Sequence, residues 1–201
     1  SKSTIWAVSQ ATSMRRMNIK GNLYLHQDGG YASGGFLADT KVAGTVSGGS
    51  QQQWLTRNSE MSNFEGVVWN NVLVGCGSNV KGVEKGWPYA ANTVVEKTPE
   101  EVEKPFLTVN DGEYSVFVPK VKNNTVGVSW SGDKVDGEFI DLDKFYVAKP
   151  GDSAAKINSQ LNAGKNLILT PGIYSLDAPI EIKNEDTIVL GLGYATLKPT
   201  N

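Results

Sequence analysis

Apolar residues near the end of the chain, within residues 151–201, first follow a helical spacing. One apolar stripe, with members three and four residues apart, consists of Ala154, Ile157 and Leu161. Asp152 or Ser153 can cap the start of this helix, because a short side-chain oxygen accepts a hydrogen bond from an unpaired backbone N–H there. Gly164 suits the left-handed position that ends a helix. The spacing therefore predicts one short helix at the start of this region.

Four short apolar runs follow this helix, separated by turn residues and with no second helical pattern between them. The runs are Leu167–Leu169, Ile173–Leu176, Ile180–Ile182 and Ile188–Leu190. Neighbouring parallel strands of an open sheet need a crossover of about a dozen or more residues between them. Strands this short and this close are better explained as successive sides of a coil.

The order of elements in residues 151–201 resembles the start of a right-handed parallel β-helix of the pectate-lyase-like superfamily. The resemblance lies in the helix, in the motif Pro171–Tyr174 between two strands, and in Thr187–Gly193, which would form one rung. In that superfamily the helix caps the end of the coil. We therefore predict an all-β fold: a right-handed parallel β-helix with a short capping helix and a small antiparallel β insertion.

Residues 1–78 contain a faint internal repeat. Met17–Leu23 can be laid over Thr40–Val46, so that apolar positions and a glycine coincide at a spacing of 23 residues. A looser third copy, Trp69–Gly75, follows further along the chain. Repeats of about 20 to 30 residues made of strands and turns are typical of solenoids, in which each coil buries a face of the next. A coil is the favoured interpretation, and a sandwich of short antiparallel strands is the alternative.

The region between these two parts, residues 79–150, has a different character. It is interrupted by Pro88, Pro99, Pro105 and Pro119. Phe106–Val118 is typical of a β-hairpin, because Asp111 and Gly112 supply the positive φ that a tight turn needs. Glu96–Lys104 is mostly charged, and we expect it to be a solvated face. This region is predicted to be a small antiparallel insertion or a β-rich linker.

Composition and charge narrow the classes of partner. The 201 residues carry 19 Lys and Arg against 21 Asp and Glu, a net charge of −2, with no basic cluster beyond Arg15 and Arg16. Nucleic acid is not an expected partner, because a surface that binds it is basic. No apolar run reaches the ~20 residues of a membrane span, so no membrane contact is expected.

Single copies of two reactive residue types exclude some kinds of site. The one cysteine, Cys76, excludes an internal disulfide, and the one histidine, His26, excludes a metal site built from histidines. Cys76 lies in an apolar run, so we predict a buried packing role for it and not a reactive thiol.

The densest run of polar and aromatic residues is Ser47–Glu60. Sugars are recognised by flat apolar platforms together with amide, guanidinium and carboxylate hydrogen bonds, and Trp54 can supply such a platform. The polar groups for substrate binding would come from Gln52, Arg57 and Asn58. Alternate residues of a strand face opposite sides, so Trp54 and Arg57 cannot line one groove unless the strand turns. The alternative interpretation is a ladder of Asn and Gln side chains with a packed tryptophan inside the solenoid.

Segments spread over residues 30–201 carry a second resemblance. They are Gly34–Val42, Ser50–Arg57, Val68–Asn70, Lys104–Leu107 and Phe145–Val147. These segments are similar to bacterial secreted β-helical proteins of the mutanase and mycodextranase group, glycoside hydrolase family 87. The resemblance implies an extracellular enzyme that hydrolyses the polysaccharide α-1,3-glucan internally, by an inverting mechanism with aspartates on the β-helix. The family's catalytic aspartates match no position here, so we expect them beyond Asn201, on further coils of the same polypeptide.

Two acids in the polar stretches of the first coils are candidates for catalysis, Asp39 and Glu60. The carboxyl groups of an inverting pair stand ~6.5–9.5 Å apart, which leaves room for the attacking water. Stacked strands lie ~4.8 Å apart, so a directly stacked pair is too close and a diagonal pair fits. The alternative for Asp39 is a structural aspartate in a turn.

A second group of acids suggests calcium: Asp133, Asp136, Glu138, Asp141 and Asp143. It lacks the D-x-D-x-D-G spacing that makes oxygen ligands converge on the ion, so no metal site and no cofactor is expected.

Three functions remain open from the sequence. The first is part of a secreted glycoside hydrolase that acts on α-1,3-glucan. The second is a polysaccharide lyase on the same fold, a reaction that needs acidic sugars and a cation or arginine beside the uronate. The third is a non-catalytic carbohydrate-binding or tailspike-like β-helix. Aspartates at neighbouring rung positions further along the polypeptide would favour the first over the third.

Overall fold

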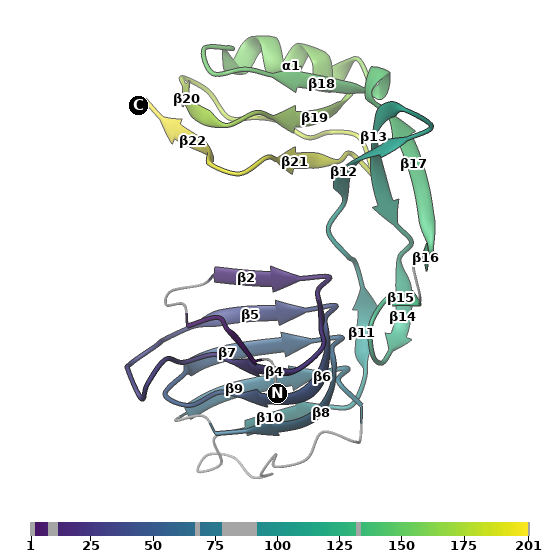
Figure 1. Cartoon of the computed structure of the whole chain (residues 1–201). Helices are drawn as coiled ribbons and strands as arrows, with labels where there is room; N and C mark the ends of the chain where they lie inside the picture. Colours follow the sequence, from purple (N-terminus) through teal and green to yellow (C-terminus); the bar gives the residue numbers. More distant parts are fainter. Residues whose placement is uncertain (1–2, 8–11, 67–68, 78–91, 132–133, 201) are drawn as a thin grey trace. The chain divides into compact units, whose positions relative to one another are not determined.

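The structure is a computed structural model with two compact units (Figure 1). It describes residues 3–7, 12–66, 69–77, 92–131 and 134–200. Unit 1 consists of Ser1–Val102 and Val121–Asp136, and unit 2 of Glu103–Lys120 and Gly137–Asn201. Within the described residues, no helix is long and apolar enough to cross a membrane.

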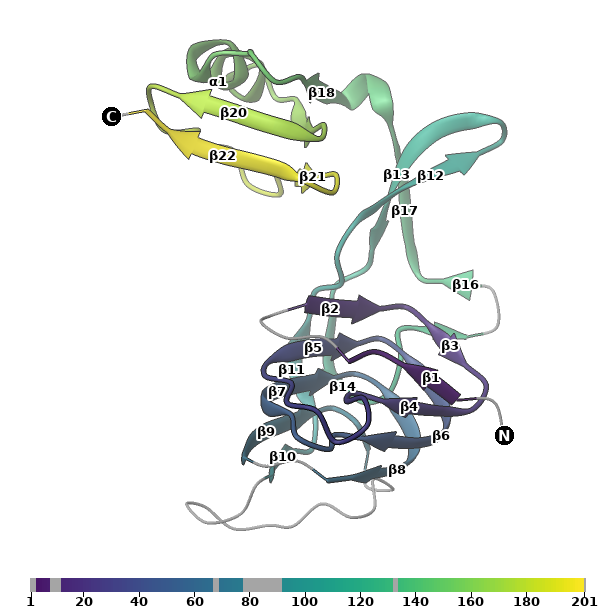
Figure 2. The ribbon, with the colours of Figure 1, turned by 60° about the vertical axis from the view of Figure 1, so that its left-hand side comes forward.

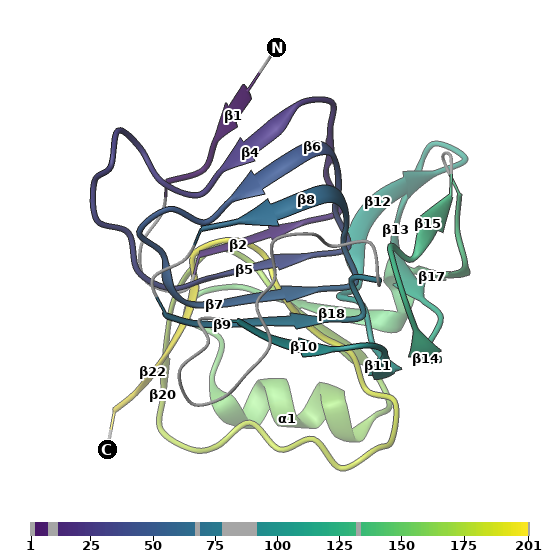
Figure 3. The same cartoon turned by 90° about the horizontal axis from the view of Figure 1, so that it is seen from below.

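Unit 1 is a parallel coil with two sheets, and the chain passes from one sheet to the other and back (Figure 3). The first sheet contains β2 (Thr12–Arg15), β5 (Gly35–Ala38), β7 (Gln52–Arg57), β9 (Trp69–Val74) and β10 (Asn92–Val95). The second contains β1 (Ser3–Ile5), β3 (Asn18–Ile19), β4 (Asn22–Tyr24), β6 (Lys41–Ser47) and β8 (Glu60–Glu65). Among the described residues, every pairing within these two sheets is parallel, which confirms the coil and excludes the antiparallel sandwich.

The predicted repeat of 23 residues is confirmed for its first two copies. Strand β6 pairs with β3 and β4, with Ile19 opposite Val42 and Leu23 opposite Val46. The third copy was wrong, because Trp69–Val74 pairs with β7 in the other sheet. The strand that follows β6 in the second sheet is β8, with Lys41 opposite Glu60. Because the coils differ in length, positions at a nearly constant spacing in the sequence can belong to strands of different sheets.

A row of left-handed residues forms the corner where the chain leaves the first sheet. This corner ladder consists of Arg16 (φ 52°), Asp39 (φ 51°), Asn58 (φ 45°) and Gly75 (φ 61°). Each of these N–H groups donates to the next coil, at 3.2 Å to Ala38 O, 3.2 Å to Arg57 O, 2.9 Å to Val74 O and 3.0 Å to Val95 O. The parallel hydrogen-bond pattern therefore continues around the corner. Glycine is required at the last position, where a Cβ would lie 2.5 Å from Thr98 Oγ1.

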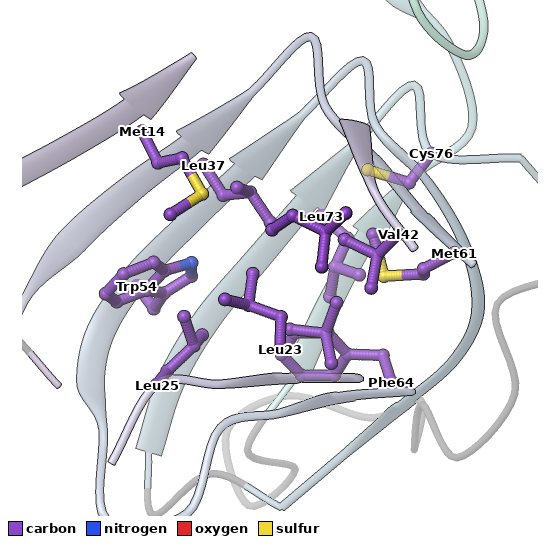
Figure 4. Close-up of a cluster of buried hydrophobic side chains, with 12 residues drawn as sticks. Met14, Leu23, Leu25, Leu37, Val42, Trp54, Met61, Phe64, Leu73 and Cys76 are labelled. Carbon is purple, nitrogen blue, oxygen red and sulfur yellow. The ribbon is translucent and has the colours of Figure 1, made fainter. Parts of the chain in front are cut away.

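The interior of the coil is filled by apolar side chains from both sheets (Figure 4). They are Met14, Ile19, Leu23, Leu25, Leu37, Val42, Val46, Trp54, Met61, Phe64, Leu73 and Cys76. Trp54 is the largest fully buried side chain among the residues described, and its ring lies against Gly35, its partner on the neighbouring strand. The predicted packing role of Cys76 is confirmed, and burial raises the pKa of its thiol to about 11. This thiol therefore stays protonated and unreactive near neutral pH.

A polar ladder extends the interior at the far end of the first sheet. Asn71 Nδ2 donates to Asn92 Oδ1 at 2.9 Å, and the two residues face each other on β9 and β10. The sequence predicted such a ladder as the alternative to a sugar site, although at other residues.

Where the structure describes the chain, the antiparallel part of the predicted region 79–150 is confined to residues 98–141, because β10 (Asn92–Val95) and β18 (Phe145–Ala148) pair in parallel with strands of the coils. Its elements are β11 (Thr98–Glu101) paired with β14 (Lys122–Thr125), β15 (Trp130–Ser131) with β16 (Lys134–Val135), and β12 (Phe106–Asn110), β13 (Glu113–Pro119) and β17 (Gly137–Asp141). Asp111 and Gly112 form the hairpin turn with positive φ. The expectation of a solvated charged run was wrong in part, since Glu101 and Glu103 are each only 2% exposed.

The second part of unit 2 confirms the helix followed by parallel rungs (Figure 2). Its elements are η1 (Leu142–Lys144), β18 (Phe145–Ala148), α1 (Ala154–Asn162), β19 (Asn166–Leu169), β20 (Gly172–Leu176), β21 (Val189–Gly191) and β22 (Ala195–Pro199). Ser153 caps α1 by accepting from Lys156 N, and the predicted apolar stripe of the helix is buried. Two strand predictions were incomplete: Ile180–Ile182 is irregular, and β22 was not foreseen.

Asp152 ties the start of α1 to the strand before it. Its carboxylate accepts from Lys156 Nζ at 2.7 Å, from Lys149 N at 2.9 Å and from Tyr146 OH at 2.8 Å. The hydrogen bond from Lys156 is the main reason that the pKa of Asp152 falls from 3.8 to about 2. A carboxyl with a depressed pKa stabilises the fold above its unfolded pKa, and this stability is lost as the pH falls through the folded value.

Replacing Asp152 by Asn is therefore expected to lower the unfolding temperature at pH 7. The difference from the parent should shrink as the pH falls from about 4 to 2, because the parent carboxylate is protonated across that window. Thermal unfolding followed by circular dichroism at several pH values measures this. Asp143→Asn is the control, because the Asp143 side chain is 67% exposed and pairs with its exposed neighbour Lys144. A Tm difference for D152N that stayed constant down to pH 2 would contradict the electrostatic account.

The contact between Gly35 and Trp54 leads to a second test. A Cβ at Gly35 would lie 2.1 Å from the indole ring, so Gly35→Ala should lower the free energy of unfolding by about 3 kcal/mol. Urea unfolding measures the loss. Gly193→Ala is the control, because nothing lies within 4 Å of a Cβ there. Equal stability of G35A and the parent would show that the interior rearranges freely.

Candidate functional site

The candidate catalytic acid Asp39 lies on the corner ladder, where it holds a later segment of unit 1. This segment, residues 122–130, is called the strap. Asp39 Oδ1 accepts from Ser129 N at 2.6 Å, and Oδ2 accepts from Ser129 Oγ at 2.8 Å. The backbone oxygen of Asp39 accepts from Trp130 Nε1 at 2.8 Å. The residue is 0% exposed, so its carboxylate is enclosed by the strap.

Asn58, predicted to bind substrate, holds the strap in the same way. Its side-chain oxygen accepts from Thr98 Oγ1 at 2.7 Å. Its amide nitrogen donates to Thr125 Oγ1 at 3.0 Å and to Gly127 O at 3.2 Å. A short polar side chain tolerates the left-handed backbone of the corner and can still bond outward, which explains Asp and Asn at these positions.

The second candidate acid, Glu60, lies just past the corner and is 49% exposed. One oxygen accepts from Val128 N of the strap at 3.4 Å, and the other is 3.3 Å from Lys41 Nζ. An inverting pair faces a shared space for water and substrate. Because Asp39 is enclosed, the structure does not present these two carboxylates as an open pair. Their contacts favour the structural alternative, and a catalytic role stays a prediction.

The remaining predicted sugar-binding residues point in different directions, as strand alternation requires. Trp54 is 1% exposed inside the coil, so its ring offers no platform to a ligand, and Gln52 is half-buried. Arg57 points outward, with its guanidinium 5.9 Å from the centre of the Phe36 ring. The guanidinium of Arg15 also lies over the Phe36 ring, 4.5 Å from its centre. The predicted sugar-binding residues of Ser47–Glu60 therefore do not line a single groove.

The acids that suggested calcium do not converge in the described part of the chain. Asp136 pairs with Lys122 at 3.8 Å, and Asp143 pairs with Lys144 at 3.4 Å. Asp133 lies outside the described residues. Among the residues that are described, no group of three or more His, Cys, Asp or Glu side chains is placed to hold a metal ion.

Unit 1 has an open polar hollow at the loop that joins β4 to β5. It measures about 470 Å³ and is lined by Ala7, Gln27, Asp28, Gly30, Tyr31 and Ala32. Tyr31 is 98% exposed, although tyrosine has a large apolar ring. Asp28 and Gly29 both have positive φ and form a tight turn, which Gly30 N closes by donating to Gln27 O at 2.7 Å.

The next coil fixes this loop. Ser50 Oγ donates to Gly30 O at 2.5 Å and accepts from Ala32 N at 3.1 Å. The buried Gln51 donates from Nε2 to Leu25 O at 2.7 Å. His26 Nε2 lies 3.2 Å from Ser47 Oγ, so the one histidine also serves to hold the loop. The backbone around the hollow is therefore set before any ligand arrives.

The hollow brings together the groups that sugar recognition requires, at residues that the sequence analysis missed. Tyr31, Gln27 and Asp28, whose side chains carry an aromatic ring, an amide and a carboxylate, all line this hollow. The available signal was the run Asp28-Gly29-Gly30-Tyr31, a turn followed at once by an aromatic residue. A turn of this kind is common in loops, so only the structure distinguishes this one.

The parallel rungs and capping helix define a pectate-lyase-like β-helix, and comparison with protein families agrees. Residues 145–201 match the LAM55 pectate lyase-like domain. Among curated proteins, the chain is similar to an exo-β-1,3-glucanase of Streptomyces sp. strain SirexAA-E, at 46% identity over 198 residues. The match covers 98% of this chain and 32% of that protein.

Solved structures also give a relative from this strain. The chain is similar to sacteLam55A from Streptomyces sp. SirexAA-E, with a TM-score of 0.90 and 45% identity. A variant of that protein in complex with glucose matches equally well. Each match covers 99% of this chain and 36% of the solved chain, so the chain spans about a third of the length of its relatives. The comparisons do not confirm the resemblance to family 87.

The strap contacts of Asp39 can be measured by a double-mutant cycle. Asp39→Ala, Ser129→Ala and the double variant should give a coupling energy of about 1 kcal/mol in the free energy of unfolding, because both single variants remove the hydrogen bond from Ser129 Oγ to Asp39 Oδ2, whereas the bond from Ser129 N is lost only when Asp39 is replaced. The cycle cancels the cost of placing alanine in the left-handed region. Additive effects would show that the bond from the Ser129 hydroxyl contributes nothing.

Asp39→Asn separates the structural role from the predicted catalytic one. If Asp39 only holds the strap, D39N lowers the Tm and leaves kcat of the natural polypeptide on its substrate unchanged. A large fall in kcat at unchanged Tm would support the catalytic interpretation instead.

Proposed function

We propose that this chain is part of a glycoside hydrolase that acts on β-1,3-glucan. The observation that carries the proposal is the similarity to an exo-β-1,3-glucanase along nearly the whole chain, at 46% identity. The solved structure of sacteLam55A from that strain adds a TM-score of 0.90. The sequence alone had favoured α-1,3-glucan through the resemblance to family 87. The named relative instead supports the β linkage.

The location of the catalytic acids is also part of the proposal. Because the chain spans about a third of its relatives, the catalytic acids can lie on coils elsewhere in the polypeptide. The enclosed Asp39 and the strap-bound Glu60 support that arrangement. In this view the chain supplies two rigid parts. Unit 1 is a coil, and unit 2 contains parallel rungs that α1 caps.

The inverting mechanism and the extracellular location complete the proposal. Inversion at a β-linked glucosyl unit releases an α-configured product. A polymeric glucan outside the cell requires a secreted enzyme, which agrees with the expectation from the sequence.

Hydrolysis of two glucans tests the linkage. The natural polypeptide that carries this sequence should release glucose or short oligosaccharides from laminarin, a β-1,3-glucan, and leave α-1,3-glucan intact. Product chromatography measures both reactions, and proton NMR of the first product measures its anomeric form. Cleavage of the α-linked polymer alone would overturn the β assignment, and a β-configured first product would overturn inversion.

A lyase and a non-catalytic binder predict other outcomes in the same assay. A lyase would release unsaturated products from uronate polymers, which absorb ultraviolet light. A binder would retain laminarin without shortening it. Either result would contradict hydrolysis.

A further inference from the structure

We propose that the hollow at Tyr31 is a glucan-binding subsite, which holds glucosyl units of a β-1,3-glucan chain. The choice of linkage rests on the proposed function, whereas the case for a neutral sugar rests on the hollow itself. Its lining residues include one with an aromatic ring, one with an amide and one with a carboxylate, and all three are exposed residues of a single loop.

The chemistry of the lining selects against other classes of ligand. None of the six lining residues carries a positive charge, and Asp28 carries a negative one, so phosphates and uronates are repelled. The accessible lining is mainly polar, which does not suit a lipid or an apolar helix. A neutral sugar offers hydroxyl groups to Gln27 and Asp28 and an apolar face of C–H groups to Tyr31.

Size and shape indicate a polymer segment as the ligand. The volume of about 470 Å³ lies within the range of ~300–1,000 Å³ that is typical of small-molecule sites. The hollow is shallow and open, so it cannot surround a free monosaccharide. A chain can lie across such a site with its neighbouring units in solvent. Binding would then be weak for each unit and useful on long chains, where attachment raises the effective concentration of substrate.

The exposed tyrosine alone does not carry the proposal, because single apolar side chains at a surface are common. Tyr194 in unit 2 is almost as exposed, at 95%, and does not line this hollow. Tyr31 differs in its setting, beside polar groups on a loop that Ser50 and Gln51 hold in place. Such preorganisation reduces the entropy lost on binding.

Titration of the chain with laminarihexaose, followed by NMR chemical shifts, tests the subsite. Tyr31→Ala should weaken binding about 3- to 10-fold, the effect expected for loss of one aromatic contact. Tyr31→Phe should stay within about twofold of the parent, because it keeps the ring. Tyr194→Ala is the matched control and should bind as the parent does. Both alanine variants replace exposed side chains, and circular dichroism verifies their fold.

Equal binding by Y31A and the parent would overturn the proposal, as would equal losses in Y31A and Y194A. Tighter binding of a β-1,4- or α-1,3-linked glucohexaose than of laminarihexaose would overturn the assigned linkage. Gln27→Ala adds a second probe, because it keeps the backbone of the turn while removing the amide, and it should also weaken binding. The outcome is separate from the proposed hydrolysis, since laminarin cleavage can fail while this binding persists, and the reverse.

Discussion

The corner ladder is the constraint on which unit 1 depends. Left-handed backbone costs a residue other than glycine about 1–2 kcal/mol. Here that cost is offset, because each corner N–H still donates to the next coil and the parallel hydrogen bonding is not interrupted. Asp39 and Asn58 add side-chain bonds to the strap, and Gly75 leaves the space that Thr98 occupies. One backbone conformation, repeated at the same corner of successive coils, thus positions both sheets.

This constraint also explains why the richest polar stretch of the sequence is not an open site. Its residues are divided by strand alternation: Trp54 faces inward, Arg57 faces outward against Phe36, and Asn58 turns the corner. The acids nearest to it are engaged by the strap. Open polar surface is found instead in the hollow of the loop between two coils, where Tyr31 stands exposed. Rigid coils with variable loops are a common arrangement in solenoids, and the loops carry the contacts to ligands.

The two units illustrate different routes to the same parallel architecture. In unit 2 a helix with a buried apolar stripe packs on the first rungs, and Asp152 links its start to the preceding strand. In unit 1 the coil is closed along one corner by a strap of later sequence. The similarity to an exo-β-1,3-glucanase extends over both units.

The sequence by itself determined the local structure and the fold class. Three predictions are confirmed: the helix stripe, the Asp111-Gly112 turn and the 23-residue repeat. The first two reflect interactions between residues close in sequence, and the third reflects residues that pair in register on neighbouring coils. Only the tertiary structure decided which side chains are open to a ligand. Burial of Trp54 and enclosure of Asp39 depend on contacts with residues 19 and 90 positions away, across coils of unequal length. The same polar and aromatic residue types can pack in an interior, turn a corner or bind a sugar. Their roles therefore follow from their position in the fold.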